Sequence, residues 1–106
     1  MRALPLLPLA LAASPALALD DLQALTLANS LGTLIASEAA CGLTYDQTAI
    51  SRFITERVPP ERMDFASQLQ LQTMGIEFQL QGMSPSALTA HCAAVTQSAR
   101  REGFID

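Results

Sequence analysis

The chain has 106 residues, half of them hydrophobic, and ten acidic residues outnumber six arginines to give a formal net charge of −4. A chain with this acidic balance and no lysine is repelled by nucleic acid and by anionic membrane surfaces, so we expect neither as a partner. The length suffices for one small domain and not for two.

The N-terminal segment has the pattern of an export signal. A positively charged start precedes an apolar run that ends in the small residues of Ala16-Leu17-Ala18. The run is shorter than the roughly 20 residues that a membrane-spanning helix needs, and it contains prolines. We therefore expect a signal peptide over residues 1–18, a periplasmic mature chain over 19–106 that forms one helical domain, and no stable membrane insertion after cleavage.

The first helix is predicted over residues 21–40. Asp20 and Asp21 suit a helix N-terminus, both as caps and as partners of the helix dipole, and Gly42 ends the segment. Apolar residues recur at helical spacing, although Gly32 weakens the middle of the run. These apolar residues are Ala24, Leu27, Leu31, Leu34 and Ile35.

A second helix follows the pattern of a capping box, in which Thr44 stands three residues before Gln47. Pro59-Pro60 stops this helix, and Pro60 is well placed to open the next one, since a proline in the first turn sacrifices no helical hydrogen bond. The buried stripe of the second helix is predicted to comprise Ile50, Phe53, Ile54 and Val58.

Residues 68–81 read QLQLQTMGIEFQLQ and allow two structures. As a hairpin, two alternating strands would pair through a three-residue loop that ends at Gly75. As a helix, the segment is rich in helix-forming residues and places apolar side chains on two sides, as expected of a central helix packed between neighbours. One stripe comprises Phe65, Leu69, Ile76, Leu80 and Met83, and the opposite one Met63, Leu71, Met74 and Phe78. The residue types favour the helix, with the hairpin as the alternative.

The last helix has the clearest boundaries. Ser84 is an N-cap followed by Pro85, two arginines occupy the last turn, and Gly103 ends the helix. Its narrow apolar stripe comprises Leu88, Cys92, Val95 and Ala99. The fold class expected from the four segments is a small all-α domain of four helices.

Cys41 and Cys92 are the two cysteines, and export favours their pairing as a disulfide. Closing a loop of this length stabilises a fold by about 4 kcal/mol in the chain-entropy model. His91 beside Cys92 suggests instead a thiol nucleophile or, with Cys41, a zinc site. Neighbouring helical side chains point about 100° apart, and a second histidine and a close cysteine pair are missing. We therefore expect no catalytic residue, metal or cofactor.

Uncharged amides beside methionines suit an adaptable contact surface, or equally a tightly packed domain. The candidate contact residues are Met63, Met74, Met83, Gln68, Gln72 and Gln79. We expect a non-enzymatic protein that acts through contacts with an unknown protein partner, as an accessory or stress-protective factor. The alternatives are a carrier of a small apolar ligand or lipid, with the third helix lining the cavity, and a thiol- or metal-dependent enzyme.

Three stretches, ASEAACGLTYDQTAI, ERMDFASQLQLQTMG and MSPSALTAHCAAV, resemble a family of small exported two-cysteine helical proteins of alphaproteobacteria. Some members carry the label "signal recognition particle", which this chain does not support because it has neither a GTPase phosphate loop nor a basic RNA-binding helix. The resemblance implies export and paired cysteines, and no activity. The predicted architecture is also similar to that of HdeA-type acid-stress chaperones, which implies a stress-protective role.

Overall fold

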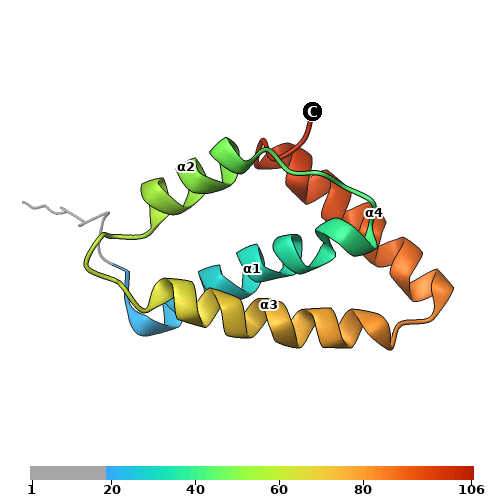
Figure 1. Cartoon of the computed structure of the whole chain (residues 1–106), viewed down its shortest axis with the longest axis horizontal. Helices are drawn as coiled ribbons and strands as arrows, with labels where there is room; N and C mark the ends of the chain where they lie inside the picture. The colour runs from blue at the N-terminus through green and yellow to red at the C-terminus, as the bar shows by residue number, and fades with distance from the viewer. Residues whose placement is uncertain (1–18) are drawn as a thin grey trace, which may run out of the picture.

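The computed structural model describes residues 19–106, and the predicted signal peptide over 1–18 lies outside this range. The described part folds into four helices without a strand: α1 (Asp21–Ala40), α2 (Gln47–Arg57), α3 (Phe65–Gln81) and α4 (Pro85–Arg101) (Figure 1). The all-α prediction is confirmed, and the hairpin alternative for residues 68–81 is wrong.

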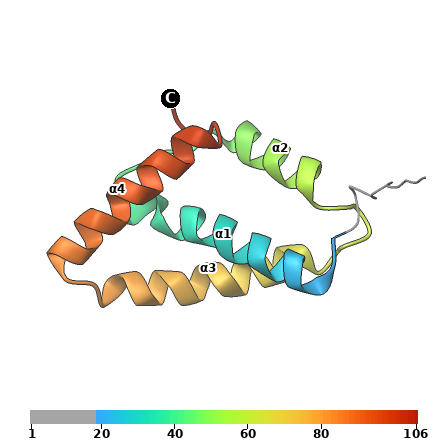
Figure 2. The same cartoon turned by 180° about the vertical axis from the view of Figure 1, so that it is seen from behind.

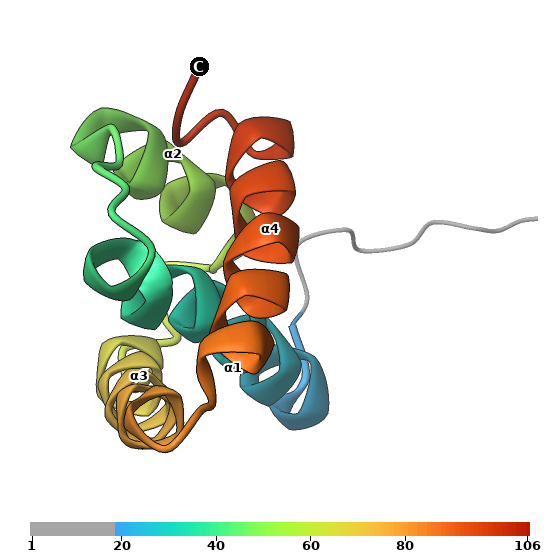
Figure 3. The ribbon, with the colours of Figure 1, turned by 90° about the vertical axis from the view of Figure 1, so that its right-hand side faces the viewer.

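Helix α1 forms the centre of the arrangement. It lies side by side with α3, and the two helices run in the same direction (Figures 1 and 2). Helix α4 crosses the end of α1 where the disulfide lies, and α2 passes along the side of α1 that α3 does not occupy (Figure 3). As a result, α3 lies at the outer edge of the fold with α1 as its main neighbour.

Two of the predicted helix starts are confirmed in detail. The Asp20 carboxylate accepts the backbone N–H of Gln23, whose side chain accepts the backbone N–H of Asp20 in return. Ser84 accepts the N–H of Ala87 and precedes Pro85. Such caps satisfy backbone donors that have no partner inside the helix.

The predicted start of the second helix is wrong by two residues. Asp46 is the N-cap of α2 and accepts the N–H groups of Thr48 and Ala49. The backbone of Asp46 is extended, with φ −72° and ψ 112°, and its N–H donates to the Phe104 carbonyl, 2.8 Å away. The chain is therefore extended up to this contact and turns helical after it.

Pro60 does not open the third helix, contrary to the sequence prediction. The structure has a seven-residue connection, 58–64, between α2 and α3. Arg62 fixes this connection to the start of α1, because its guanidinium bonds the Asp21 carboxylate at 2.7 Å and also pairs with Asp64. The hydrogen bond to Asp21 raises the pKa of Arg62 above its ordinary value.

The contact between α1 and α3 depends on small residues of α1. Ala24 and Ala28 are fully buried, and a β-carbon built on Gly32 would lie 3.2 Å from the Thr73 hydroxyl oxygen of α3. Close approach of two helices requires this lack of side-chain volume. Gly32, which weakens α1 by its low helix propensity, thus permits the packing of α3.

An aromatic cluster packs on the side of α1 that faces away from α3. Phe104 follows α4 and lies between Tyr45 and Phe53, with ring centroids 5.5 and 5.7 Å away. All three rings are buried together with Val95 and Ala99 of α4. Sequence periodicity identified Phe53 and the α4 stripe, whereas Tyr45 and Phe104 lie outside the helices and were missed.

The predicted disulfide between Cys41 and Cys92 is present, with Cα atoms 5.4 Å apart. Cys41 caps the end of α1, and Gly42 follows it with a positive φ of 68°. The bond therefore joins the end of α1 to the first half of α4, across 51 positions of sequence.

Candidate functional site

Helix α3 exposes three large apolar side chains, Leu71, Met74 and Phe78, which we call the α3 apolar face. Their exposed fractions are 70, 56 and 76%. The opposite side of the helix is packed, since Phe65 and Leu80 are buried. The prediction of a helix covered on two sides is therefore wrong, because α1 covers one side of α3 and no described element covers the other.

The surroundings of this face are almost free of charge. Glu77 is the one charged residue in the 17 residues of α3. The side chains that flank the face are mostly glutamines, and Gly75 within it has open space where a β-carbon would stand. Large apolar residues on an uncharged surface are typical of protein contact sites, because soluble chains seldom expose them without a partner.

The predicted methionine contacts lie along α3 but differ in exposure. Met74 belongs to the α3 apolar face, whereas Met63 stands in the connection before α3 with 86% of its surface exposed. Met83 follows the end of α3, and 36% of its surface is exposed. Leu71 and Phe78 fall in the same predicted stripe as Met74, although the predicted contact residues did not include them.

The predicted glutamine contacts do not form one surface. Gln72 is half-buried and accepts a hydrogen bond from Asn29 of α1, 3.1 Å away. Gln68 is also half-buried and donates to Asp64, while its amide oxygen is buried without a protein partner. Gln79 alone is exposed. Gln72 is thus a packing residue between helices rather than a contact residue.

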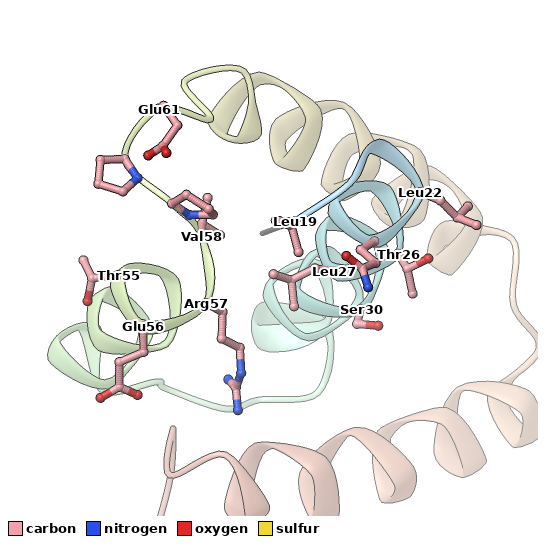
Figure 4. Close-up of a pocket in the computed structure, with 13 residues that line it drawn as sticks. Leu19, Leu22, Thr26, Leu27, Ser30, Thr55, Glu56, Arg57, Val58 and Glu61 are labelled. Carbon is pink, nitrogen blue, oxygen red and sulfur yellow. The ribbon is translucent and has the colours of Figure 1, made fainter. Parts of the chain in front are cut away.

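A groove of about 710 Å³ lies between α1 and α2 and continues along the connection after α2 (Figure 4). Its apolar residues are Leu19, Leu22, Leu27, Val58, Pro59 and Pro60. Hydroxyl groups of Thr26, Ser30 and Thr55 interrupt the apolar wall. This volume falls within the range of small-molecule sites, but α3, the predicted wall of a ligand cavity, contributes no residue to it.

The charges around the groove favour a neutral or cationic occupant over an anion. Glu56 and Glu61 line it beside a single arginine, Arg57. That arginine is already engaged, because its guanidinium stacks 3.9 Å from the centre of the Phe53 ring and pairs with Glu102 at 3.4 Å. It is therefore not free to bind a carboxylate or phosphate without losing these contacts.

His91 does not face Cys92 but bonds Ser37 of α1, with 2.7 Å between Nε2 and the hydroxyl oxygen. Ser37 is fully buried, and its hydroxyl donates to the Thr33 carbonyl. A hydroxyl that donates to a carbonyl must accept from the imidazole, so Nε2 carries a proton. The Ser37–His91 hydrogen bond therefore links α1 to α4 next to the disulfide. The Ser37 hydroxyl oxygen is buried and is not accessible to a substrate.

The cysteines are consumed by the disulfide, so neither supplies a thiolate for the predicted alternatives of a nucleophile or a zinc ligand. Within residues 19–106, no group of three or more histidine, cysteine, aspartate or glutamate side chains is arranged to hold a metal ion. A smaller hollow of about 380 Å³ between α1 and α4 includes His91 and is bordered by Arg101 and Glu102.

Tyr45 is the buried ionisable group with the largest change in acidity. Its hydroxyl donates to the Leu34 carbonyl at 2.8 Å, and its ring is almost inaccessible to solvent. Burial, with a smaller contribution from the charge of Glu38, raises the pKa of Tyr45 to about 12. The tyrosine is therefore a neutral structural donor at physiological pH.

Comparison of the chain with protein families, curated proteins and solved structures finds no match. Over the described residues, no helix combines the length and the apolar character that crossing a membrane requires. The resemblances drawn from the sequence therefore stay predictions.

Proposed function

We propose that this protein is a non-enzymatic periplasmic factor that acts by binding another protein through the α3 apolar face. The observation that supports the proposal is the exposure of Leu71, Met74 and Phe78 on a helix with one charge. Each of these side chains gains about 1.5–3 kcal/mol when it is fully removed from water. Burial under a partner would provide most of this favourable free energy. The isolated chain does not gain it, because the three side chains stay exposed to water.

Site-specific photo-crosslinking in the periplasm of the native host tests the proposal. A photoreactive residue in place of Phe78 should yield a reproducible adduct with one protein. The same residue in place of Ala66, which is exposed on another side of α3, serves as the matched control and should not. An absence of adducts at positions 71, 74 and 78, in a chain that is exported and oxidised, would reject the proposal.

Export has its own test. The intact mass of the periplasmic protein should correspond to a chain that begins at Leu19 and lacks two hydrogens, and it should not change on alkylation before reduction. A chain that keeps residues 1–18 would reject export with cleavage, whatever the result for α3.

A second candidate function is binding of a small apolar ligand, supported by the groove between α1 and α2. The ligand should be neutral or cationic, since Glu56 and Glu61 border the groove and Arg57 is engaged. Native mass spectrometry of the periplasmic protein should then show an added mass. Val58→Gln, in the groove, should lose this mass, and Phe78→Ser, outside the groove, should keep it.

A further inference from the structure

We propose that the groove between α1 and α2 binds an apolar aldehyde and holds it as an imine on the α-amino group of Leu19. The inference rests on the proposed cleavage after Ala18 and on the second candidate function, and it names the class of ligand and the residue that anchors it. Three observations support it: the position of Leu19 in the groove, the absence of lysine from the chain, and the charges that border the groove.

The first residue of the predicted mature chain lies in the groove. The half-buried side chain of Leu19 lines it together with Val58 and Pro59, and Leu19 and Val58 lie opposite each other (Figure 4). The backbone nitrogen is bonded to the same Cα atom as this side chain, at about 1.5 Å. Once Ala18 is removed, this nitrogen is a free amine beside the apolar wall of the groove.

Hydrogen bonds on both sides of Leu19 fix its position. Its carbonyl oxygen accepts a bond from the Arg62 guanidinium, 3.2 Å away, and Arg62 also bonds the Asp21 carboxylate. The backbone N–H of the next residue, Asp20, donates to the side chain of Gln23. Chain termini are usually poorly ordered unless such contacts hold them. The amine therefore stays at the groove rather than sampling the solvent around it.

The amine of Leu19 has no competitor in the mature chain. The sequence contains no lysine, so the α-amino group is the one primary amine after cleavage. An α-amino group ordinarily has a pKa near 8, against about 10.4 for a lysine side chain, so more of it is unprotonated at neutral pH. Unprotonated amines attack carbonyl carbons to form imines, as catalytic lysines do. The groove thus places the chain's one primary amine beside a space of about 710 Å³.

Imine formation in the groove needs no further reactant. The lone pair of the Leu19 nitrogen forms a bond to the carbonyl carbon, and the π electrons of the carbonyl move to its oxygen. Loss of water, which carries away that oxygen and the two hydrogens of the amine, leaves a carbon–nitrogen double bond. Neither an oxidant nor a reductant takes part. Addition of water reverses the reaction, so the aldehyde is bound reversibly.

The charges around the groove favour a neutral carbonyl compound over other apolar ligands. A carboxylate would be repelled by Glu56 and Glu61, while Arg57 is already engaged in other contacts. An amine ligand would be repelled by the protonated α-amino group of Leu19. An aldehyde meets neither repulsion, and its hydrocarbon chain gains free energy by leaving water for the apolar wall at Val58.

Reductive trapping of the mature periplasmic chain tests the inference, with octanal as the probe. Cyanoborohydride converts the imine into a stable secondary amine, so intact mass and peptide mapping should find one octyl group, on Leu19. The trapping rate should saturate with octanal concentration. At low concentration it should exceed the rate for the free peptide Leu-Asp-Asp-Leu by about tenfold or more. This peptide has the sequence of residues 19–22 and reports the reactivity of the same amine without a groove.

Two variants and a second aldehyde separate the groove from the amine. Val58→Gln places an amide in the apolar wall opposite Leu19 and should lower the trapping rate about fivefold or more. Phe78→Ser, on the α3 apolar face, should leave the rate unchanged. Glyceraldehyde, which is polar, should react no faster with the protein than with the peptide. Circular dichroism checks that both variants keep the fold.

A mature chain that traps octanal no faster than the peptide does would overturn the inference. An intact mass that does not begin at Leu19 would overturn it too, together with the proposed cleavage after Ala18. If native mass spectrometry finds a bound ligand that cyanoborohydride does not attach to Leu19, the second candidate function stands and the imine is rejected.

Discussion

Gly32 of α1 lies directly against Thr73 of α3, so that a β-carbon on the glycine would stand 3.2 Å from the threonine hydroxyl and 3.3 Å from its backbone nitrogen. The absent side chain thus sets the distance between the two helices that form the centre of the fold. The first prediction concerns this contact.

Gly32→Ala should lose the benefit that alanine normally brings to a helix. Replacing an exposed helical glycine by alanine stabilises by up to about 1 kcal/mol, and Gly75→Ala, in open space on α3, should show this gain. At Gly32 the new carbon overpacks against α3, which typically costs about 1–3 kcal/mol. Denaturant unfolding in dilute solution should place Gly32→Ala at least about 1 kcal/mol below Gly75→Ala, and equal stability of the two would contradict the packing argument.

Removal of the disulfide should cost about as much as the whole stability of a small domain. A Cys41→Ala, Cys92→Ala double variant loses the constraint on a loop of 51 positions, which corresponds to about 4 kcal/mol in the chain-entropy model. Urea unfolding of the double variant and of the oxidised wild type measures the difference. Reduced and alkylated wild type is the control and should resemble the variant. A loss below about 1 kcal/mol would show that helix packing alone holds the fold.

Tyr45 should make the fold sensitive to alkali. Its pKa is about 12 when folded against 10 ordinarily, so folding favours the protonated phenol. The sign of the effect follows: this contribution is complete below pH 10 and is lost as the pH rises from about 10 to about 12.

The chain makes this measurement simple because Tyr45 is its one tyrosine and it has no tryptophan. The ultraviolet absorbance of phenolate therefore reports a single group, and it should titrate near pH 12 in the folded chain and near pH 10 in urea. Tyr45→Phe removes the hydrogen bond to the Leu34 carbonyl, so the free energy of unfolding at neutral pH should fall by about 1 kcal/mol. The variant should also lack the decrease in stability between pH 10 and pH 12 that ionisation of Tyr45 causes. A phenol that titrates near pH 10 in the folded chain would contradict its burial.

Two phenylalanines should separate packing from contact. Phe104 is 1% exposed within the aromatic cluster, and Phe104→Ala should cost about 3–5 kcal/mol. Phe78→Ala should change the stability of the monomer by about 0.5 kcal/mol or less, since its side chain makes little contact within the chain. Thermal or chemical unfolding in dilute solution gives both values, and a large loss at Phe78 would mean that α3 packs on both sides after all.

The helices and the disulfide could be predicted because their signals are local. Asp20 and Ser84 accept hydrogen bonds from backbone N–H groups three residues later, and Pro85 occupies the first turn of its helix. Two cysteines have one intramolecular pairing. Phe104 gave no such signal, because a single aromatic residue after a helix has no periodicity. Its position depends on the hydrogen bond from the Asp46 N–H to the Phe104 carbonyl, which connects residues far apart in the sequence.

The candidate sites were less predictable for a related reason. Periodicity correctly grouped Leu71, Met74 and Phe78 on one side of a helix, but it does not state whether another element covers that side. The groove between α1 and α2 has no pattern in the sequence, since residues such as Leu27 and Val58 come together only through the course of the 58–64 connection. Both sites are consequences of where α3 and α2 lie relative to α1.

The exposure of Met74 and Met63 has a chemical consequence in an oxidising compartment. Oxidants convert accessible methionine to the sulfoxide, which is polar and chiral, and reductases can reverse the change. Sulfoxide at Met74 would put a strong hydrogen-bond acceptor in the middle of an otherwise apolar contact. If α3 binds a partner as proposed, oxidation of Met74 would therefore weaken binding before it weakens the fold.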